Sequence, residues 1–257
     1  MKLIILAGGF GTRLGERTAT IPKPMVQIGG KPIMWHIMKI YSFYGINQFV
    51  ICLGYRGEII KDFFYNYQMK NNDFTINLSD HSVVYHNNHH EDDWQVTLVD
   101  TGINTLKGAR LKRVERYLDD EINLLTYGDG VANINISELI EFHNSHDKIV
   151  TISGVYPPAR FGELIVNGDE LILFEEKAQT SQGLINGGYM IFNKELLNYV
   201  CTDEDCDLEI GTFEKLTAER KIAVYKHQGL WACMDHERDV KYLNQLWNKN
   251  EAFWKVW

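Results

Sequence analysis

Short apolar runs alternate with amphipathic stretches through the first half of the chain, and this alternation limits the folds available to it. Apolar spacing predicts strands at 3–6, 48–53, 123–127 and 148–154, and helices at 33–43, 58–65 and 137–143, the last capped by Ser137. Alternation of this kind predicts an α/β fold, with a mostly parallel sheet covered on both faces by helices. In such sheets, ligands bind beyond the carboxyl ends of the strands.

The later parts of the chain carry weaker signals. Residues 66–95 are polar and are best interpreted as a solvated excursion, with short strands expected at 74–78 and 82–85. A histidine group there raises the alternative of a metal site, but no paired supporting ligands accompany it (His81, His86, His89, His90). A strand is expected at 221–226 and a helix at 237–247. The tail 247–257 holds three tryptophans, which favours packing on the core or on a partner subunit.

Composition narrows the class of partner. The 257 residues suit one α/β domain with a small appendage. A formal net charge of −8 argues against a general nucleic-acid partner, which calls for a basic face. The apolar run at 3–7 is too short for a signal peptide and no segment approaches membrane-spanning length, so we expect a cytoplasmic protein without a membrane partner. The four scattered cysteines are expected to be reduced thiols.

A glycine loop opens directly from the first predicted strand. Gly8, Gly9 and Gly11 let the main chain approach a ligand closely, and Arg13 and Lys23 bring positive charge to the same place. Backbone amides and two cations beside a strand end describe a polyphosphate site. A plain tight turn would be favoured without the two cations. The dinucleotide and ATPase-type phosphate-loop patterns both fail, because their glycine spacing and Gly-Lys-Ser/Thr element are missing.

Two acidic residues and an arginine are further candidates for the chemistry. Asp129 lies between Gly128 and Gly130 after an apolar strand, where a cation site and an Asp-Gly turn are about equally well supported. Asp235, taken alone, is a surface residue or a helix cap. Arg110 is expected to open a helix from which it reaches a phosphate or a pyrimidine carbonyl, and the alternative is a plain surface arginine.

Taken together, the block Leu-Ala-Gly-Gly-Phe-Gly-Thr-Arg-Leu and the later Pro22-Lys23-Pro24 resemble the signature of the sugar-phosphate nucleotidyltransferases. The resemblance extends over nearly the whole chain and is weakest at 66–95 and 200–220. It implies a Rossmann-like fold with a small β-rich sugar-binding part and a C-terminal helical element. It also implies a single domain 1–257, with 1–130 mainly binding nucleotide, 131–235 mainly binding sugar phosphate, and 236–257 packing or forming an oligomer.

The resemblance assigns roles to residues. It makes Arg13 and Lys23 catalytic and places the metal, Mg²⁺, on Asp129 and Asp235. The implied sugar-phosphate residues are Gly162, Glu176, Lys177 and Asn186. The implied nucleotide-binding residues are Leu6, Ala7, Gly8, Gly9, Gly11, Thr12, Arg13, Lys23, Thr105, Arg110, Gly128 and Asp129.

Within the family, the paired Gly29-Gly30 and the segment Glu16-Arg17-Thr18 are most similar to the branch that uses CTP. The implied reaction joins CTP and α-D-glucose 1-phosphate to give CDP-glucose and pyrophosphate, in a homo-oligomeric enzyme. Two alternatives remain open. One is an enzyme of the same fold that uses UTP, dTTP or another phosphorylated acceptor. The other is a non-catalytic sensor of nucleotide or sugar phosphate.

Overall fold

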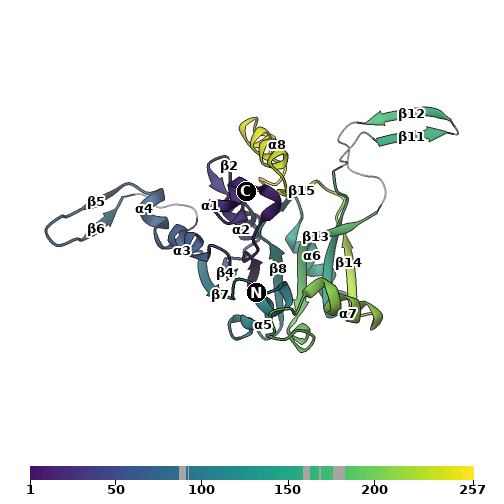
Figure 1. Ribbon diagram of the computed structural model, residues 1–257, viewed down its shortest axis with the longest axis horizontal. Coiled ribbons are helices and arrows are strands. Elements are labelled where there is room, and N and C mark those ends of the chain that lie inside the picture. Colours follow the sequence, from purple (N-terminus) through teal and green to yellow (C-terminus); the bar gives the residue numbers. More distant parts are fainter. Residues whose placement is uncertain (87–90, 92, 159–162, 168, 176–182) are drawn as a thin grey trace.

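The computed structural model describes residues 1–86, 91, 93–158, 163–167, 169–175 and 183–257. At its centre is a seven-stranded sheet (Figure 1). The strand order is β14 (Ile222–Lys226), β10 (Val150–Val155), β13 (Ile185–Asn193), β8 (Ile122–Tyr127), β1 (Leu3–Leu6), β4 (Gln48–Leu53) and β7 (Gln95–Asp100). Only β13 runs antiparallel to its neighbours in this sheet. The predicted mixed, mostly parallel sheet is confirmed.

Helices cover the sheet, and small hairpins surround it. The α-helices of the described residues are α1 (Glu16–Thr20), α2 (Ile33–Phe43), α3 (Gly57–Tyr65), α4 (Tyr67–Asn71), α5 (Lys107–Arg113), α6 (Ile136–Asn144), α7 (Glu214–Ala218) and α8 (Glu237–Asn248). Two-stranded pairs are β2 (Gln27–Ile28) with β3 (Lys31–Pro32), β5 (Phe74–Ile76) with β6 (Val83–Tyr85), β9 (Gly130–Ala132) with β15 (Trp231–Cys233), and β11 (Glu163–Asn167) with β12 (Glu170–Glu175).

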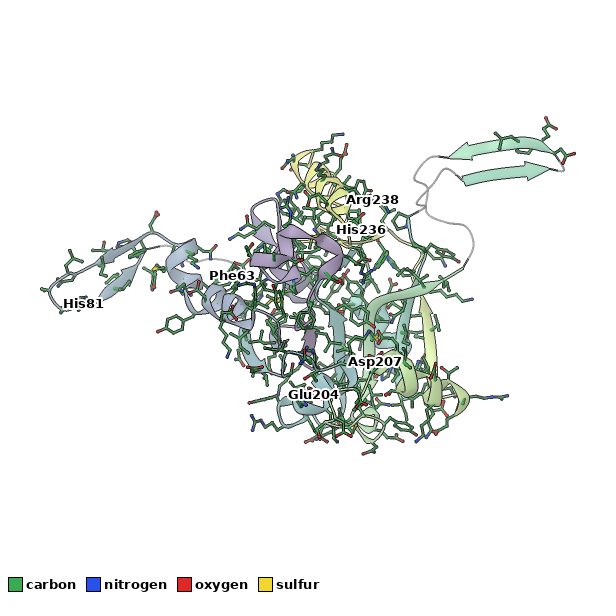
Figure 2. All side chains as sticks on the ribbon, in the orientation of Figure 1. Phe63, His81, Glu204, Asp207, His236 and Arg238 are labelled. Carbon is green, nitrogen blue, oxygen red and sulfur yellow. The ribbon has the colours of Figure 1, made fainter. Side chains whose placement is uncertain are left out.

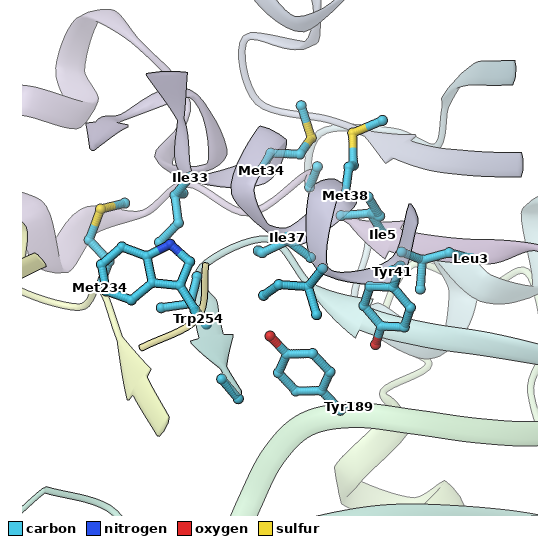
Figure 3. Close-up of a cluster of buried hydrophobic side chains, with 14 of the residues drawn as sticks. Leu3, Ile5, Ile33, Met34, Ile37, Met38, Tyr41, Tyr189, Met234 and Trp254 are labelled. Carbon is cyan, nitrogen blue, oxygen red and sulfur yellow. The ribbon is translucent and has the colours of Figure 1, made fainter. Parts of the chain in front are cut away.

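The core lies in two layers, one on each face of the sheet. Successive side chains of a strand point to opposite faces, so Leu3 and Ile5 join one apolar cluster while Ile4 joins the other. The first cluster is built on α2 and also contains Trp254 from the C-terminal tail (Figure 3). There the rings of Tyr41 and Tyr189 stack at 5.6 Å. This layer holds the first strand, and hence the glycine loop, in position.

Two local predictions were wrong. Helix α6 is capped by Asn135 rather than Ser137, because the Asn135 side chain accepts hydrogen bonds from the main-chain N–H groups of Ser137 and Glu138. Arg110 does not open its helix. It is the fourth residue of α5 and is buried, so its side chain starts from the inner face of the helix.

The polar excursion forms an exposed hairpin. Strands β5 and β6 extend away from the sheet (Figure 1), and His81 lies at the tip with a positive φ (Figure 2). His81 and His86 are both exposed, and His89 and His90 lie outside the described residues. Neither described histidine belongs to the group of possible metal ligands found among the described residues.

The C-terminal tail packs on the core of its own chain. Trp254 is fully buried in contact distance of α2, and helix α8 lies against β2 near the N-terminal third of the chain (Figures 1 and 3). Trp247 sits so close to Gly29 that a Cβ there would lie 2.1 Å from the indole ring. Among the described residues, no helix has the length and apolar character needed to cross a membrane.

Candidate active site

The carboxyl ends of several strands meet at one open cavity of about 670 Å³. The loop after β1 forms one side, the segment around α5 forms another, and the end of β8 closes it. All twelve residues predicted to bind nucleotide line this cavity: Leu6, Ala7, Gly8, Gly9, Gly11, Thr12, Arg13, Lys23, Thr105, Arg110, Gly128 and Asp129. Residues from Leu6 to Asp129 are thus brought to one place, as strand-end geometry leads one to expect.

The glycine loop offers main-chain donors to this cavity. The main-chain N–H groups of Gly8, Gly9 and Gly11 have no protein acceptor among the described residues. Gly11 has φ +65°, in the left-handed region that favours glycine, and a Cβ there would lie 3.0 Å from the side chain of Lys23. Unpaired N–H groups beside two cations suit an anionic ligand.

The Arg110 guanidinium binds main-chain carbonyls of the glycine loop and of the neighbouring strand ends. Its Nη2 donates to the carbonyl of Gly8 at 3.0 Å, and its Nη1 donates to those of Leu53 and Gly102 at 2.9 and 2.7 Å. A Cβ on Gly8 would lie 2.1 Å from Nη1. One buried side chain therefore joins the ends of β1, β4 and β7. Its donors are largely engaged by the protein, which the sequence did not indicate.

Lys23 lies between the two acidic candidates. Its ammonium is 2.5 Å from the Asp129 carboxylate and 2.6 Å from that of Asp235, and the residue is 8% exposed. Burial lowers the pKa of Lys23, but the charge and hydrogen bonds of Asp129 and Asp235 outweigh it, and the net pKa is raised. Burial acts to raise the pKa of Asp235, yet Lys23 and Arg13 hold it below its usual value. Both shifts favour the charged forms of Lys23 and Asp235.

The same cluster fits a hard divalent cation. One potential ligand atom from each of Asp129, Cys233 and Asp235 lies within 4.8 Å of the others. Carboxylate oxygens together with substrate phosphates are the usual Mg²⁺ environment, whereas a thiol is a soft ligand. Burial and the neighbouring carboxylates raise the pKa of Cys233, which favours the neutral thiol. The two carboxylates are therefore the fitting pair, and the Lys23 ammonium lies where they converge.

A second, smaller cavity of about 240 Å³ adjoins the first. Arg13, Tyr127 and Asp129 line both cavities, and Asp235 and Asn186 line the second. Asn186 begins the Asn-Gly-Gly segment of β13, whose glycines leave room for neighbouring groups. The other three predicted sugar-phosphate residues, Gly162, Glu176 and Lys177, lie outside the described residues.

Sequence reasoning missed several residues of these cavities. Tyr127 precedes the Gly-Asp-Gly segment, so its place beside Asp129 could have marked it. Lys107 and Glu209 line the first cavity, and Trp231 donates from Nε1 to the Gly187 carbonyl at 2.8 Å. Glu209 lies in the stretch where the resemblance was weakest, and nothing in its local pattern distinguished it. Burial, followed by the Glu209 carboxylate, raises the pKa of Tyr127, so its phenol stays protonated.

A glycine loop at a strand end, paired cations and converging carboxylates define a protein that handles polyphosphates on an α/β sheet. The model of the nucleotidyl transferase family matches residues 2–252, and the protein belongs to that family. Members of this family generally use a divalent metal ion.

Individual relatives are similar over the full chain. The glucose-1-phosphate cytidylyltransferase of Salmonella typhimurium is 44% identical, with 100% of both chains covered. The probable glucose-1-phosphate cytidylyltransferase of Bacillus subtilis is 40% identical, again over 100% of both chains. The crystal structure of HddC from Yersinia pseudotuberculosis superposes with a TM-score of 0.68 at 23% identity, covering 96% of this chain and 99% of that one. That superposition supports the same fold.

Proposed function

We propose that the protein is a glucose-1-phosphate cytidylyltransferase, which joins CTP and α-D-glucose 1-phosphate to form CDP-glucose and pyrophosphate. The observation that carries this proposal is the full-length identity of 44% and 40% to two proteins of that description. The structure supplies two adjoining cavities that share Arg13 and Asp129, as a reaction between two phosphorylated substrates requires. The sugar phosphate is already an anionic nucleophile, so the protein has to align it and stabilise charge.

In this proposal the larger cavity holds CTP. The main-chain N–H groups of Gly8, Gly9 and Gly11 donate to the triphosphate, and Thr12 adds to this cradle. Arg13, whose side chain is 65% exposed, holds the departing pyrophosphate. Lys23 contacts the α-phosphate, because its ammonium is fixed by two carboxylates on the side where the two cavities meet. These are the charges that the transition state needs.

The smaller cavity holds the sugar phosphate. Asn186 binds sugar hydroxyls, and the resemblance adds Gly162, Glu176 and Lys177, with the lysine on the incoming phosphate. Asp129 and Asp235 would hold Mg²⁺ through their carboxylates. Magnesium in that place would neutralise phosphate charge during in-line displacement.

Subunit association and the cellular compartment belong to this proposal as well. We expect a homo-oligomer in the cytoplasm. The exposed apolar side chains of the hairpin β5–β6 support association, since an isolated two-stranded hairpin is marginally stable. Among the described strands, Ile76, Val83 and Val84 are each more than 40% exposed.

Substitution of the two cations tests the assignment of the catalytic residues. Arg13→Ala and Lys23→Ala should each lower turnover by about 10²-fold or more, because each contact is felt mainly in the transition state. The assay is pyrophosphate release with CTP and glucose 1-phosphate. Arg17→Ala is the matched control, since Arg17 is an exposed arginine paired with Glu237 just beyond the loop. Near-normal turnover in both cation variants would overturn the assignment.

The substrates are tested by a matrix of CTP, UTP and dTTP against several hexose 1-phosphates. We expect the highest kcat/KM for CTP with glucose 1-phosphate. A preference for UTP or dTTP would favour the alternative enzyme of the same fold. Nucleotide binding without turnover under any pairing would favour a sensor.

A further inference from the structure

The side chain of Tyr127 forms part of the wall between the two cavities. It lines both of them, at the end of β8 and directly before the Gly128-Asp129 pair. On one side it meets Glu209, which comes from the irregular segment Leu208–Phe213. On the other side it meets Asn186 of β13. A single phenol therefore links a carboxylate of the nucleotide cavity with an amide of the sugar cavity.

The protons in this chain of contacts can be assigned. A carboxylate only accepts hydrogen bonds, so the Tyr127 hydroxyl donates to Oε1 of Glu209. The other oxygen of Glu209 is ion-paired with the Lys107 ammonium at 2.6 Å. With its proton engaged, the Tyr127 oxygen acts as an acceptor and takes a hydrogen bond from Nδ2 of Asn186 at 3.1 Å.

The hydrogen bonds of Tyr127 and Gly188 determine the orientation of the Asn186 side-chain amide. Its Oδ1 accepts from the main-chain N–H of Gly188 at 2.9 Å, and its Nδ2 donates to Tyr127. Both ends of the amide are thereby assigned by partners of opposite polarity. One N–H of Nδ2 has no acceptor among the described residues, and Asn186 lines the smaller cavity. That N–H is the donor the protein offers to a sugar oxygen.

We propose that Glu209 is a positioning residue which, through Tyr127, orients the Asn186 amide to donate to a hydroxyl oxygen of the sugar phosphate. This inference rests on the proposed function, because it takes the smaller cavity as the sugar site. Glu209 acts without touching the sugar. It is a residue for selectivity between hydroxyl arrangements, since a half-buried amide with fixed polarity rejects a hydroxyl placed wrongly.

Glu209→Gln is the discriminating substitution. Lys107 attracts the carbonyl oxygen of the new amide, which turns its NH₂ group toward Tyr127. The Tyr127 oxygen then accepts from Gln, and its proton must go to Asn186 or stay unpaired. An Asn186 amide that turned to accept it would lose the hydrogen bond from Gly188. The size of the side chain is unchanged, so the effect comes from hydrogen-bond polarity.

The test is steady-state kinetics of pyrophosphate release. For Glu209→Gln we expect the KM for glucose 1-phosphate to rise about fivefold to tenfold, as loss of one neutral hydrogen bond implies, with the KM for CTP within about twofold of wild type. Discrimination against an epimer of glucose 1-phosphate should fall by a similar factor. Tyr127→Phe, which removes the hydroxyl without changing charge, should give the same pattern.

Glu214→Gln is the matched control. Glu214 lies next to the same irregular segment and accepts a hydrogen bond from the Gly211 N–H, but it does not contact Tyr127. Its variant should keep wild-type KM values for both substrates. If Glu209→Gln left the KM for glucose 1-phosphate unchanged, or raised both KM values equally, the inference would be wrong. Absence of turnover in the wild-type protein would instead contradict the proposed function.

An NMR measurement that needs no substrate tests the positioning role of Glu209 independently of the proposed function. The side-chain NH₂ resonances of Asn186, identified by their loss in Asn186→Asp, should shift in NMR spectra of Glu209→Gln and of Tyr127→Phe. They should stay in place in Glu214→Gln. Unchanged Asn186 resonances in both test variants would overturn the positioning role, whatever reaction the protein catalyses.

Discussion

The two buried cations of the site, Lys23 and Arg110, play different roles because they have different partners. Lys23 faces two carboxylates, so its charge is balanced by groups that can also bind a metal ion. Arg110 faces the main-chain carbonyls of Gly8, Leu53 and Gly102, and it adds a charged donor to each of them. A planar guanidinium carries five N–H donors on three nitrogens and reaches carbonyls that lie apart, whereas an ammonium offers three donors from a single nitrogen. Arg110 therefore acts first on the shape of the loop.

Arg110→Lys tests this at the level of one residue. The variant should unfold with a free energy lower by about 2–4 kcal/mol, because a lysine cannot reproduce the several buried hydrogen bonds that the guanidinium makes. It should also raise the KM for the nucleotide, since the Gly8 carbonyl loses its hydrogen bond from the guanidinium. Urea denaturation and steady-state kinetics measure the two effects. Arg116→Lys, at an exposed arginine, should change stability by no more than about 0.5 kcal/mol. Equal stability of both variants would contradict the assignment.

Among the elements, β13 decides how the two cavities adjoin. It alone runs antiparallel in the main sheet, and it pairs with β8 so that Tyr189 lies opposite Thr126. This register brings the Asn-Gly-Gly start of β13 beside Tyr127 at the end of β8. Gly188 has φ +79°, and a Cβ there would lie 2.8 Å from the Tyr127 ring. The glycine is thus required both by the backbone conformation and by the ring beside it.

Gly188→Ala tests the packing of β13 on β8. The left-handed conformation costs an alanine about 1 kcal/mol, and the close contact with Tyr127 adds about 1–3 kcal/mol. Gly45→Ala is the matched control, with φ +82° and no atom within 4 Å of the added Cβ. For Gly45→Ala we expect only the cost of the left-handed conformation, about 1 kcal/mol. Thermal or urea unfolding of both variants gives the difference, and a loss in Gly45→Ala as large as in Gly188→Ala would contradict the contact.

At the scale of the whole molecule, the C-terminal tail packs against helix α2 in the first apolar cluster. The imidazole of His36, in α2, is fully buried and donates from Nε2 to the Ile28 carbonyl at 2.8 Å. The indole of Trp254 donates to Nδ1 of His36 at 3.4 Å. The rings of Trp247 and His36 meet edge to face, with their centroids 4.7 Å apart. Burial lowers the pKa of His36 to about 4. The neutral side chain of His36 in α2 thus contacts two tryptophans of the C-terminal segment.

The lowered pKa predicts how stability depends on pH. Between about pH 4 and 6.5 the unfolded chain binds a proton at His36 that the folded protein excludes, so this residue makes stability fall as the pH is lowered through that window. The full effect is about 3 kcal/mol. Unfolding free energies of wild type and His36→Gln, measured across the window, should differ in slope, with the steeper fall in wild type. Identical slopes would show that His36 is not held neutral.

The sequence by itself determined the sheet, its principal helices and the glycine loop after the first strand, because each depends on local apolar spacing and on residues adjacent in the chain. The twelve predicted nucleotide-site residues followed from the resemblance carried by the glycine-loop block and Pro22-Lys23-Pro24, and in the structure they line one cavity. Only the tertiary structure decided the partners of buried polar groups. Arg110 binding the Gly8 carbonyl, Asn135 rather than Ser137 capping α6, and Glu209 reaching Tyr127 all depend on close distances within the packed structure. Hydrogen bonds act over about 3 Å, and no pattern along the chain encodes which distant atoms come that close.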